Sequence, residues 1–128
     1  MLTESVLQST KKILGIPEGQ DAFDEDVLTH INSAFSVLSQ LGVLVEEGVN
    51  VPDDTFTWTD LDLPAAWIQA IRTYVFLKTQ LLFDPPTTSF LLAARQKQVE
   101  EHEWRLSMMR EYSIREEVVY VPDPYDGW

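Results

Sequence analysis

The longest apolar pattern in the chain extends from Pro64 to Phe83 and has the period of an α-helix. Arg72 and Lys78 are its only charged residues. The apolar stripe recurs every three or four positions, at Trp67/Ile68, Ile71, Tyr74/Val75 and Leu81/Leu82. We expect a central helix that begins near Thr59 or Asp60, with Pro64 in its first turn. Because so few of its positions are polar, this helix must be covered on most sides, by its own chain or by copies of it.

The end of the central helix is marked by Phe83, Asp84, Pro85 and Pro86, which we interpret as a rigid structural corner. A proline cannot donate a hydrogen bond within a helix, and Pro85 disfavours the α conformation at Asp84. We therefore expect the central helix to stop near Phe83. A hydroxyl shortly afterwards can cap the next helix, from Thr87, Thr88 or Ser89. A connection this short favours an antiparallel helical hairpin.

The last predicted helix, at about 89–110, has a narrower apolar stripe than the central helix. Its main apolar positions repeat at intervals of seven, at Leu92, Val99 and Leu106. Charged residues occupy its other faces, and Glu101 and Arg105 have the spacing of an i,i+4 ion pair. This mixed-charge surface is either solvated or a contact between subunits. For the second reading the candidate interface residues are Arg95, Glu101, Trp104 and Arg105.

Two further helices are predicted before the central one. The first covers Thr3–Leu14, with Thr3 as the cap candidate and Gly15 as its end. The second starts at the acidic run Asp24–Asp26, because the N-terminus of a helix favours negative charge. It continues to the residue before Gly42.

Residues 43–59 lose the helical period and alternate in a β-like way, which indicates an irregular hairpin or an extended loop. Phe56 and Trp58 are expected to hold this excursion against the core. The predicted fold class is mainly α, a small bundle of about four helices with the short β-like excursion and an extended C-terminal tail. We expect a helical domain over residues 1–112 and the tail over residues 113–128.

The tail begins with β-forming residues and ends with the turn-forming run PDPYDGW. Two placements stay open for it. It can pack on its own domain, or it can add a strand to a partner chain. For the second placement the candidate docking residues are Val118, Val119, Tyr120, Val121, Tyr125 and Trp128.

The chain is strongly acidic, with 21 Asp and Glu against 9 Lys and Arg and a net charge of −12. Seven of the basic residues lie between Arg72 and Arg115, so the first seventy residues are almost purely acidic outside Lys11 and Lys12. Tight binding of a phosphate backbone needs clustered Lys and Arg, which argues against a nucleic-acid binder. A surface that DNA passes without adhering remains compatible with this charge.

Cysteine is absent, which excludes a disulfide scaffold, thiolate zinc and thiol catalysis. We expect neither a signal peptide nor a membrane span, because the N-terminus lacks a basic start with an apolar run and charges interrupt the central helix.

No catalytic signature is present, so we expect no enzyme activity, no cofactor and no metal site. Asp26 and His30 are spaced to share a metal, as are Glu101 or Glu103 with His102, but each pair offers at most two ligands. One function that the acidic composition allows is a small interaction module or inhibitor that binds a basic partner protein.

Three segments carry a resemblance to a known family: HINSAFSVLSQLGV at 30–43, RTYVFLKTQLLFDPP at 72–86 and TSFLLAARQKQVEEHEWRL at 88–106. Their order and content resemble the head-tail connector, or adaptor, family of tailed bacteriophages. The most specific pieces are the FDPPTTSF corner and the EHEWRL turn of the last helix. The resemblance covers about Leu2 to Met109.

This resemblance implies a structural virion protein, made in the cytoplasm of the bacterial host, that forms a ring of about twelve copies in the neck. Its partners would be its own copies, the portal protein and a tail-side stopper or tail completion protein. DNA would pass through the lumen without specific binding, and no membrane, cofactor or catalytic residue would be involved. In related connectors the C-terminal segment engages the portal, which makes residues 118–128 the docking candidate here.

Overall fold

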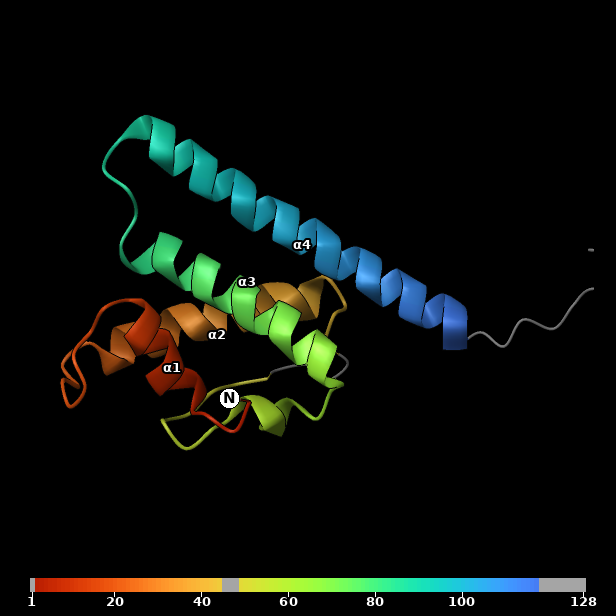
Figure 1. Cartoon of the computed structure of the whole chain (residues 1–128), viewed down its shortest axis with the longest axis horizontal. Coiled ribbons are helices and arrows are strands. Elements are labelled where there is room, and N and C mark those ends of the chain that lie inside the picture. Colours follow the sequence, from red (N-terminus) through yellow and green to blue (C-terminus); the bar gives the residue numbers. More distant parts are fainter. Residues whose placement is uncertain (1, 45–48, 118–128) are drawn as a thin grey trace, which may run out of the picture.

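The computed structural model of this protein describes residues 2–44 and 49–117 (Figure 1). Its helices are α1 (Val6–Ile13), α2 (Asp24–Gln40), the short 3₁₀ helix η1 (Trp58–Leu61), α3 (Ala65–Phe83) and α4 (Ser89–Glu117). α3 lies in the middle, with α1 and α2 packed against one side of it and α4 running along the other. The prediction of a mainly α bundle of about four helices is confirmed.

Glycines end the first two helices as their sequences indicate. Gly15 and Gly42 follow α1 and α2 with φ of 78° and 76°, a left-handed conformation that glycine adopts without steric cost. The start of α1 differs from the prediction, because Ser5 rather than Thr3 is the cap. The Ser5 hydroxyl accepts a hydrogen bond from the Gln8 backbone N–H at 3.3 Å.

The excursion predicted at 43–59 is an extended loop rather than a hairpin in the part that the structure describes. It pairs there with the N-terminal segment through an isolated antiparallel bridge between Thr57 and Ser5, and the Val6 N–H donates to the Phe56 carbonyl beside it at 2.9 Å. Asn32 of α2 holds the loop from inside, since its side-chain amide donates to the Val51 carbonyl at 3.1 Å and accepts from the Val51 N–H at 2.7 Å. Residues 45–48 of the excursion lie outside the described residues.

Trp58 is fully buried and anchors the end of this loop, as predicted. Its indole N–H donates to the Ser9 hydroxyl at 3.0 Å, and its ring meets the Phe76 ring edge-on with centroids 5.7 Å apart. Phe56, the second aromatic expected to hold the excursion, is partly buried against the same core. The anchor therefore joins the loop to both α1 and α3.

α3 begins later than its sequence indicates. Asp60 accepts a hydrogen bond from the Thr57 N–H at 2.8 Å, which closes a separate 3₁₀ turn. Asp62 then takes a left-handed conformation with φ of 53°, and Pro64 is the cap of α3 instead of part of its first turn. The expected start at Thr59 or Asp60 is therefore wrong, because a local side-chain contact stabilises a different turn.

α4 ends later than predicted, at Glu117 rather than at about Arg110. No glycine or proline occurs between these two positions, so no strong stop signal is present. Residues 113–117, which were expected in the extended tail, continue the helix. Its C-terminal end projects beyond the rest of the bundle (Figure 1).

Candidate assembly surfaces

The corner after α3 has the form that its prolines predict. α3 ends at Phe83, and the Asp84 N–H bonds the Gln80 carbonyl at 2.9 Å. The Phe83 ring packs edge-on against Phe23 at the start of α2, with centroids 5.8 Å apart, and also against His30 in the second turn of that helix. The corner is therefore fixed to the neighbouring helix by aromatic contacts as well as by proline geometry.

Thr88, one of the three predicted cap candidates, precedes α4 and caps it. Its hydroxyl accepts from the Leu91 N–H at 3.4 Å, and its carbonyl accepts from the Leu92 N–H at 3.0 Å. α3 and α4 therefore form a helical hairpin, in which α3 ends at Phe83 and Thr88 caps α4.

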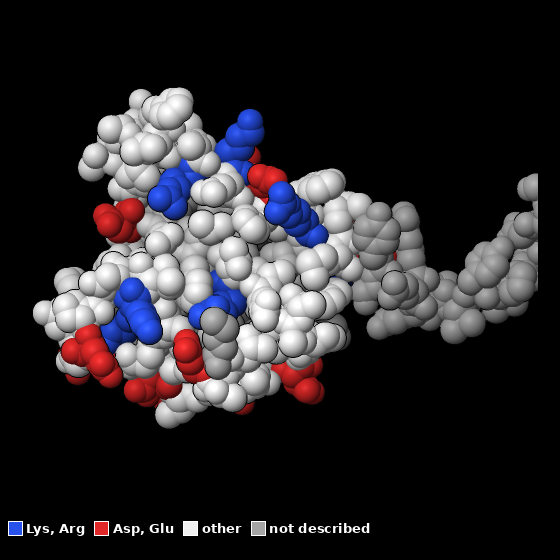
Figure 2. All heavy atoms as spheres, in the orientation of Figure 1, with Lys and Arg blue, Asp and Glu red and all other residues white. Residues whose placement is uncertain are grey.

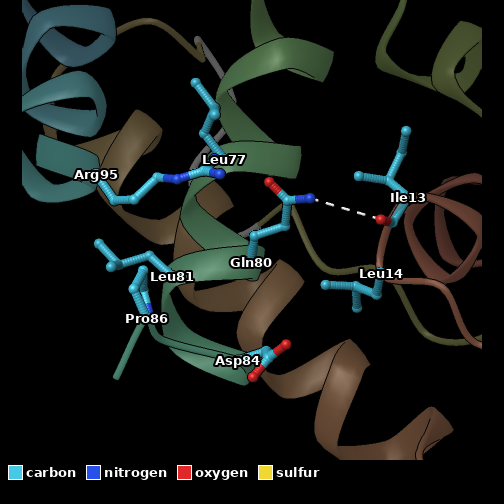
Figure 3. A pocket seen from close by; sticks show the side chains of 8 residues that line it. All are labelled: Ile13, Leu14, Leu77, Gln80, Leu81, Asp84, Pro86 and Arg95. Atoms are coloured by element: carbon cyan, nitrogen blue, oxygen red, sulfur yellow. Dashed lines mark hydrogen bonds between the residues drawn. The ribbon is translucent and has the colours of Figure 1, made fainter. Parts of the chain in front are cut away.

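A groove of about 270 Å³ crosses the surface of α3 between α1 and α4. Figure 3 shows its lining, which is Ile13, Leu14, Leu77, Gln80, Leu81, Asp84, Pro86 and Arg95. The Gln80 side-chain amide donates to the Ile13 carbonyl at 3.5 Å across it. We call this feature the α1–α3 groove. The central helix contributes Leu77, Gln80 and Leu81 to it.

The inner face of α4 packs against α3. Val99 and Leu106 are 3% and 1% exposed there, as the seven-residue repeat predicts. The buried Tyr74 of α3 donates its hydroxyl to the Glu103 carboxylate of α4 at 2.9 Å. Burial, and then this carboxylate, raise the pKa of Tyr74 far above its usual value, so the phenol stays protonated.

The outer face of α4 exposes large apolar side chains. Phe90 is 81% exposed and Trp104 is 64% exposed, and Leu91 beside them is also open to solvent. Seven residues make nearly two helical turns, so Phe90, Lys97 and Trp104 lie along one side. Exposed aromatic residues at this spacing are typical of a contact surface rather than of a solvated face.

The four residues predicted as a subunit interface fall on two surfaces. Glu101 and Arg105 form the expected i,i+4 ion pair, 2.6 Å between Oε1 and Nη2, beside the exposed Trp104. Arg95 instead lines the α1–α3 groove. The sequence reasoning missed Phe90 and the groove, although the repeat of Phe90, Lys97 and Trp104 was a signal for the first of them.

Comparison with known protein families gives one finding. The family model described as phage connector protein matches residues 6–113, which is most of the chain. The chain belongs to the phage connector protein family. Searches of curated proteins and of solved structures returned no match. The resemblance inferred from the three sequence segments is therefore confirmed.

Membership of this family makes the connector a structural component of the phage virion, with a role in joining head and tail. The family is one of structural proteins. Within residues 2–44 and 49–117, no helix is long and apolar enough to cross a membrane. Over the same ranges, no three His, Asp or Glu side chains are grouped so that they could hold a metal ion.

The charge of the connector is unevenly distributed. On the face in Figure 2, most acidic side chains lie along the lower edge, while basic ones lie over the upper part, in the middle and at the lower left. Lys11, one of two basic residues in the N-terminal half, has a side chain only 4% exposed and lies 2.7 Å from the Asp24 carboxylate. Because Lys11 is buried, Lys12 is the one exposed basic side chain among residues 2–44 and 49–70, so the exposed charges of this half are mainly acidic.

Proposed function

We propose that the connector forms a ring beneath the portal, at the opening through which DNA leaves the head. The ring joins the portal to a tail-side stopper or tail completion protein and continues the DNA channel. By its resemblance to related connectors it contains about twelve copies, related by rotation. The observation that carries this proposal is the family match over residues 6–113.

Two unlike surfaces on each copy support a ring. A ring built from one chain needs heterologous contacts, in which different patches of neighbouring copies meet. The connector has the exposed aromatic side chains of α4 and, at a different place, the α1–α3 groove. A chain with a single self-complementary patch would instead form a closed dimer.

The net charge of −12 supports a passage for DNA rather than a binding site for it. Acidic side chains on the inner wall would repel the phosphate backbone, so DNA would move through without adhering. We therefore expect the lumen to be lined mainly by the acidic N-terminal half. The α4 face, with its larger share of Arg and Lys, would point elsewhere.

The C-terminal segment is our candidate for portal docking. Its residues Val118, Val119, Tyr120, Val121, Tyr125 and Trp128 lie outside the described residues. The chain reaches them through α4, whose end projects from the bundle (Figure 1). A β-forming segment at the end of such a helix can add a strand to a partner sheet.

Electron microscopy of portal rings incubated with the connector tests this function. We expect class averages with an added collar on one end of the portal. Portal rings that stay unchanged, together with a tight one-to-one complex between this chain and a basic protein, would instead favour an acidic inhibitor. The control is a portal whose exposed charged residues are replaced by neutral ones. A collar on this portal as well would show that decoration does not depend on unspecific charge attraction.

A further inference from the structure

α4 is held mainly by one neighbour. Its buried positions Val99 and Leu106 face α3 and stand about 10 Å apart along the helix. The helix continues to Glu117, roughly 16 Å beyond Leu106, and leads there to residues 118–128 (Figure 1). Packing preferences leave the crossing angle of a helix pair free by about 15–20°. The direction of this long end therefore depends on any further contact that α4 makes.

Arg110 gives α4 such a contact, with the end of α2. Its side chain is half-buried and lies against Gly42, the left-handed residue that follows α2. A Cβ built on Gly42 would stand 2.5 Å from Nε and 2.8 Å from Cζ of Arg110, closer than real Cβ atoms come to other heavy atoms. The guanidinium therefore occupies space that is open only because residue 42 is a glycine.

The end of α2 is a favourable place for this cation. The Gly42 N–H donates to the Ser39 carbonyl at 3.0 Å. The Val43 N–H donates to the Leu38 carbonyl at 3.0 Å, which completes a Schellman motif. The carbonyls of a last turn carry partial negative charge, and a nearby cation is stabilising there. The last turn of α2 has no basic residue of its own, so Arg110 of α4 supplies the cation from another helix.

A second contact matters because α4 is long. From Val99 to Glu117 the helix covers about 27 Å, so a tilt of about 15–20° around Val99 would move its end by roughly 7–9 Å. One residue of a strand covers about 3.3 Å, and a slip by one residue turns every side chain to the other face. A β-forming segment that starts from a tilted helix end would therefore meet a partner sheet in the wrong register.

Building on the proposed docking of residues 118–128, we propose that Arg110 is a positioning residue for the portal contact. Its guanidinium on Gly42 fixes the direction in which α4 presents the C-terminal segment. The two residues act as a pair, since Gly42 leaves the space and Arg110 fills it. The portal then meets a helix end that is already oriented, which reduces the ordering that binding requires.

Gly15 offers a matched control for Gly42. Both follow the end of a helix, with φ of 78° at Gly15 and 76° at Gly42. Within the described residues, and apart from its chain neighbours, a Cβ on Gly15 meets no heavy atom within 4 Å. Gly15→Ala therefore adds backbone strain alone, whereas Gly42→Ala adds the same strain and displaces Arg110.

Hydrogen exchange of the full-length variants, read by mass spectrometry, tests the contact. Exchange over residues 107–117 should be about fivefold faster in Gly42→Ala than in Gly15→Ala, with residues 89–99 unchanged. Arg110→Ala should show the same increase and Arg110→Lys a smaller one, because lysine keeps the cation. These two variants leave the backbone at Gly42 unaltered, so they decide the question even if Gly42→Ala unfolds.

The double variant tests whether the two residues act as a pair. Gly42→Ala combined with Arg110→Ala should exchange no faster over residues 107–117 than Arg110→Ala alone, once the strain measured by Gly15→Ala is subtracted. Additive effects of the two substitutions would overturn the pair. Unchanged exchange in Arg110→Ala would overturn the contact itself.

Portal decoration tests the positioning role. Arg110→Ala and Gly42→Ala should both need about fivefold more connector than the natural chain for half-decoration of portal rings, and Gly15→Ala should need the natural amount. Normal decoration by Gly42→Ala with weakened decoration by Arg110→Ala would overturn the role, because Arg110 would then touch the portal itself.

The failure of this inference differs from the failure of the proposed function. Faster exchange in Arg110→Ala with decoration at the natural concentration would overturn the positioning role and leave the proposed function standing. If the natural connector does not decorate portals, the proposed function is wrong and the positioning role falls with it.

Discussion

Individual polar side chains join elements that are distant in sequence. Asn32 bonds both backbone groups of Val51, Trp58 bonds Ser9, and the Tyr74 hydroxyl bonds Glu103. Each bond involves a buried or partly buried group, for which water is a poor substitute partner. None of these pairs could be predicted from the sequence, because polar residues carry no periodicity that identifies a partner many residues away.

Asn32→Ala should destabilise the connector by about 2–4 kcal/mol, because it leaves the buried N–H and C=O of Val51 without partners. Urea unfolding followed by circular dichroism measures the change. Ser36→Ala on the same helix is exposed and should stay within about 0.5 kcal/mol of the natural chain. Equal stability of the two variants would show that Asn32 does not hold the loop.

Tyr74→Phe should cost about 1–2 kcal/mol at neutral pH, because it removes a hydrogen bond to a carboxylate. It should also change the response to alkali. Folding raises the pKa of Tyr74, so its contribution is complete below the unfolded value of about 10 and is lost as pH rises above it. Unfolding free energies from pH 8 upward should therefore fall more steeply for the natural chain than for Tyr74→Phe. Parallel curves would contradict the role assigned to this phenol.

At the scale of elements, helices with clear apolar stripes and glycine or proline stops were predictable. Gly15, Gly42 and Pro85 mark the ends of α1, α2 and α3 as expected, because each limits the backbone locally. The start of α3 was missed, since the contact of Asp60 with Thr57 creates a separate turn. The end of α4 was missed for the opposite reason, because no residue there stops a helix.

Replacing Pro85 and Pro86 together with alanine should change the direction of α4 more than the stability of the bundle. Alanines let α3 continue past Phe83, while the added freedom of the unfolded chain costs about 0.4–1 kcal/mol for each proline. We expect circular dichroism to keep its helical signal and portal decoration to be lost. Pro17→Ala, in the link between α1 and α2, should leave decoration intact. A double variant that still decorates portals would contradict the importance of the corner.

For the whole molecule, the sequence predicted that α3 is too apolar to stand in solvent, but it did not predict which apolar faces stay exposed after folding. The sequence indicated that α3 needs cover, and the structure shows that α2 and α4 supply most of it. Large exposed apolar side chains lie instead on the outer face of α4, at Phe90, Leu91 and Trp104. A helical period tells which residues share a face, but it does not tell which neighbour covers that face.

Deleting residues 118–128 should leave a folded connector that no longer docks on the portal. The described core is built from residues before this segment. We expect an unchanged melting temperature by circular dichroism and the loss of the collar in electron micrographs. A truncated chain that unfolds would show that the segment belongs to the core, and one that still decorates portals would rule it out as the docking element.

A cryo-EM map of the connector bound to its portal would show the proposed ring itself. We expect a closed ring of rotationally related copies on one end of the portal, with acidic side chains of the N-terminal half along its lumen. Isolated copies without rotational contacts, or a lumen lined mainly with Arg and Lys, would contradict it.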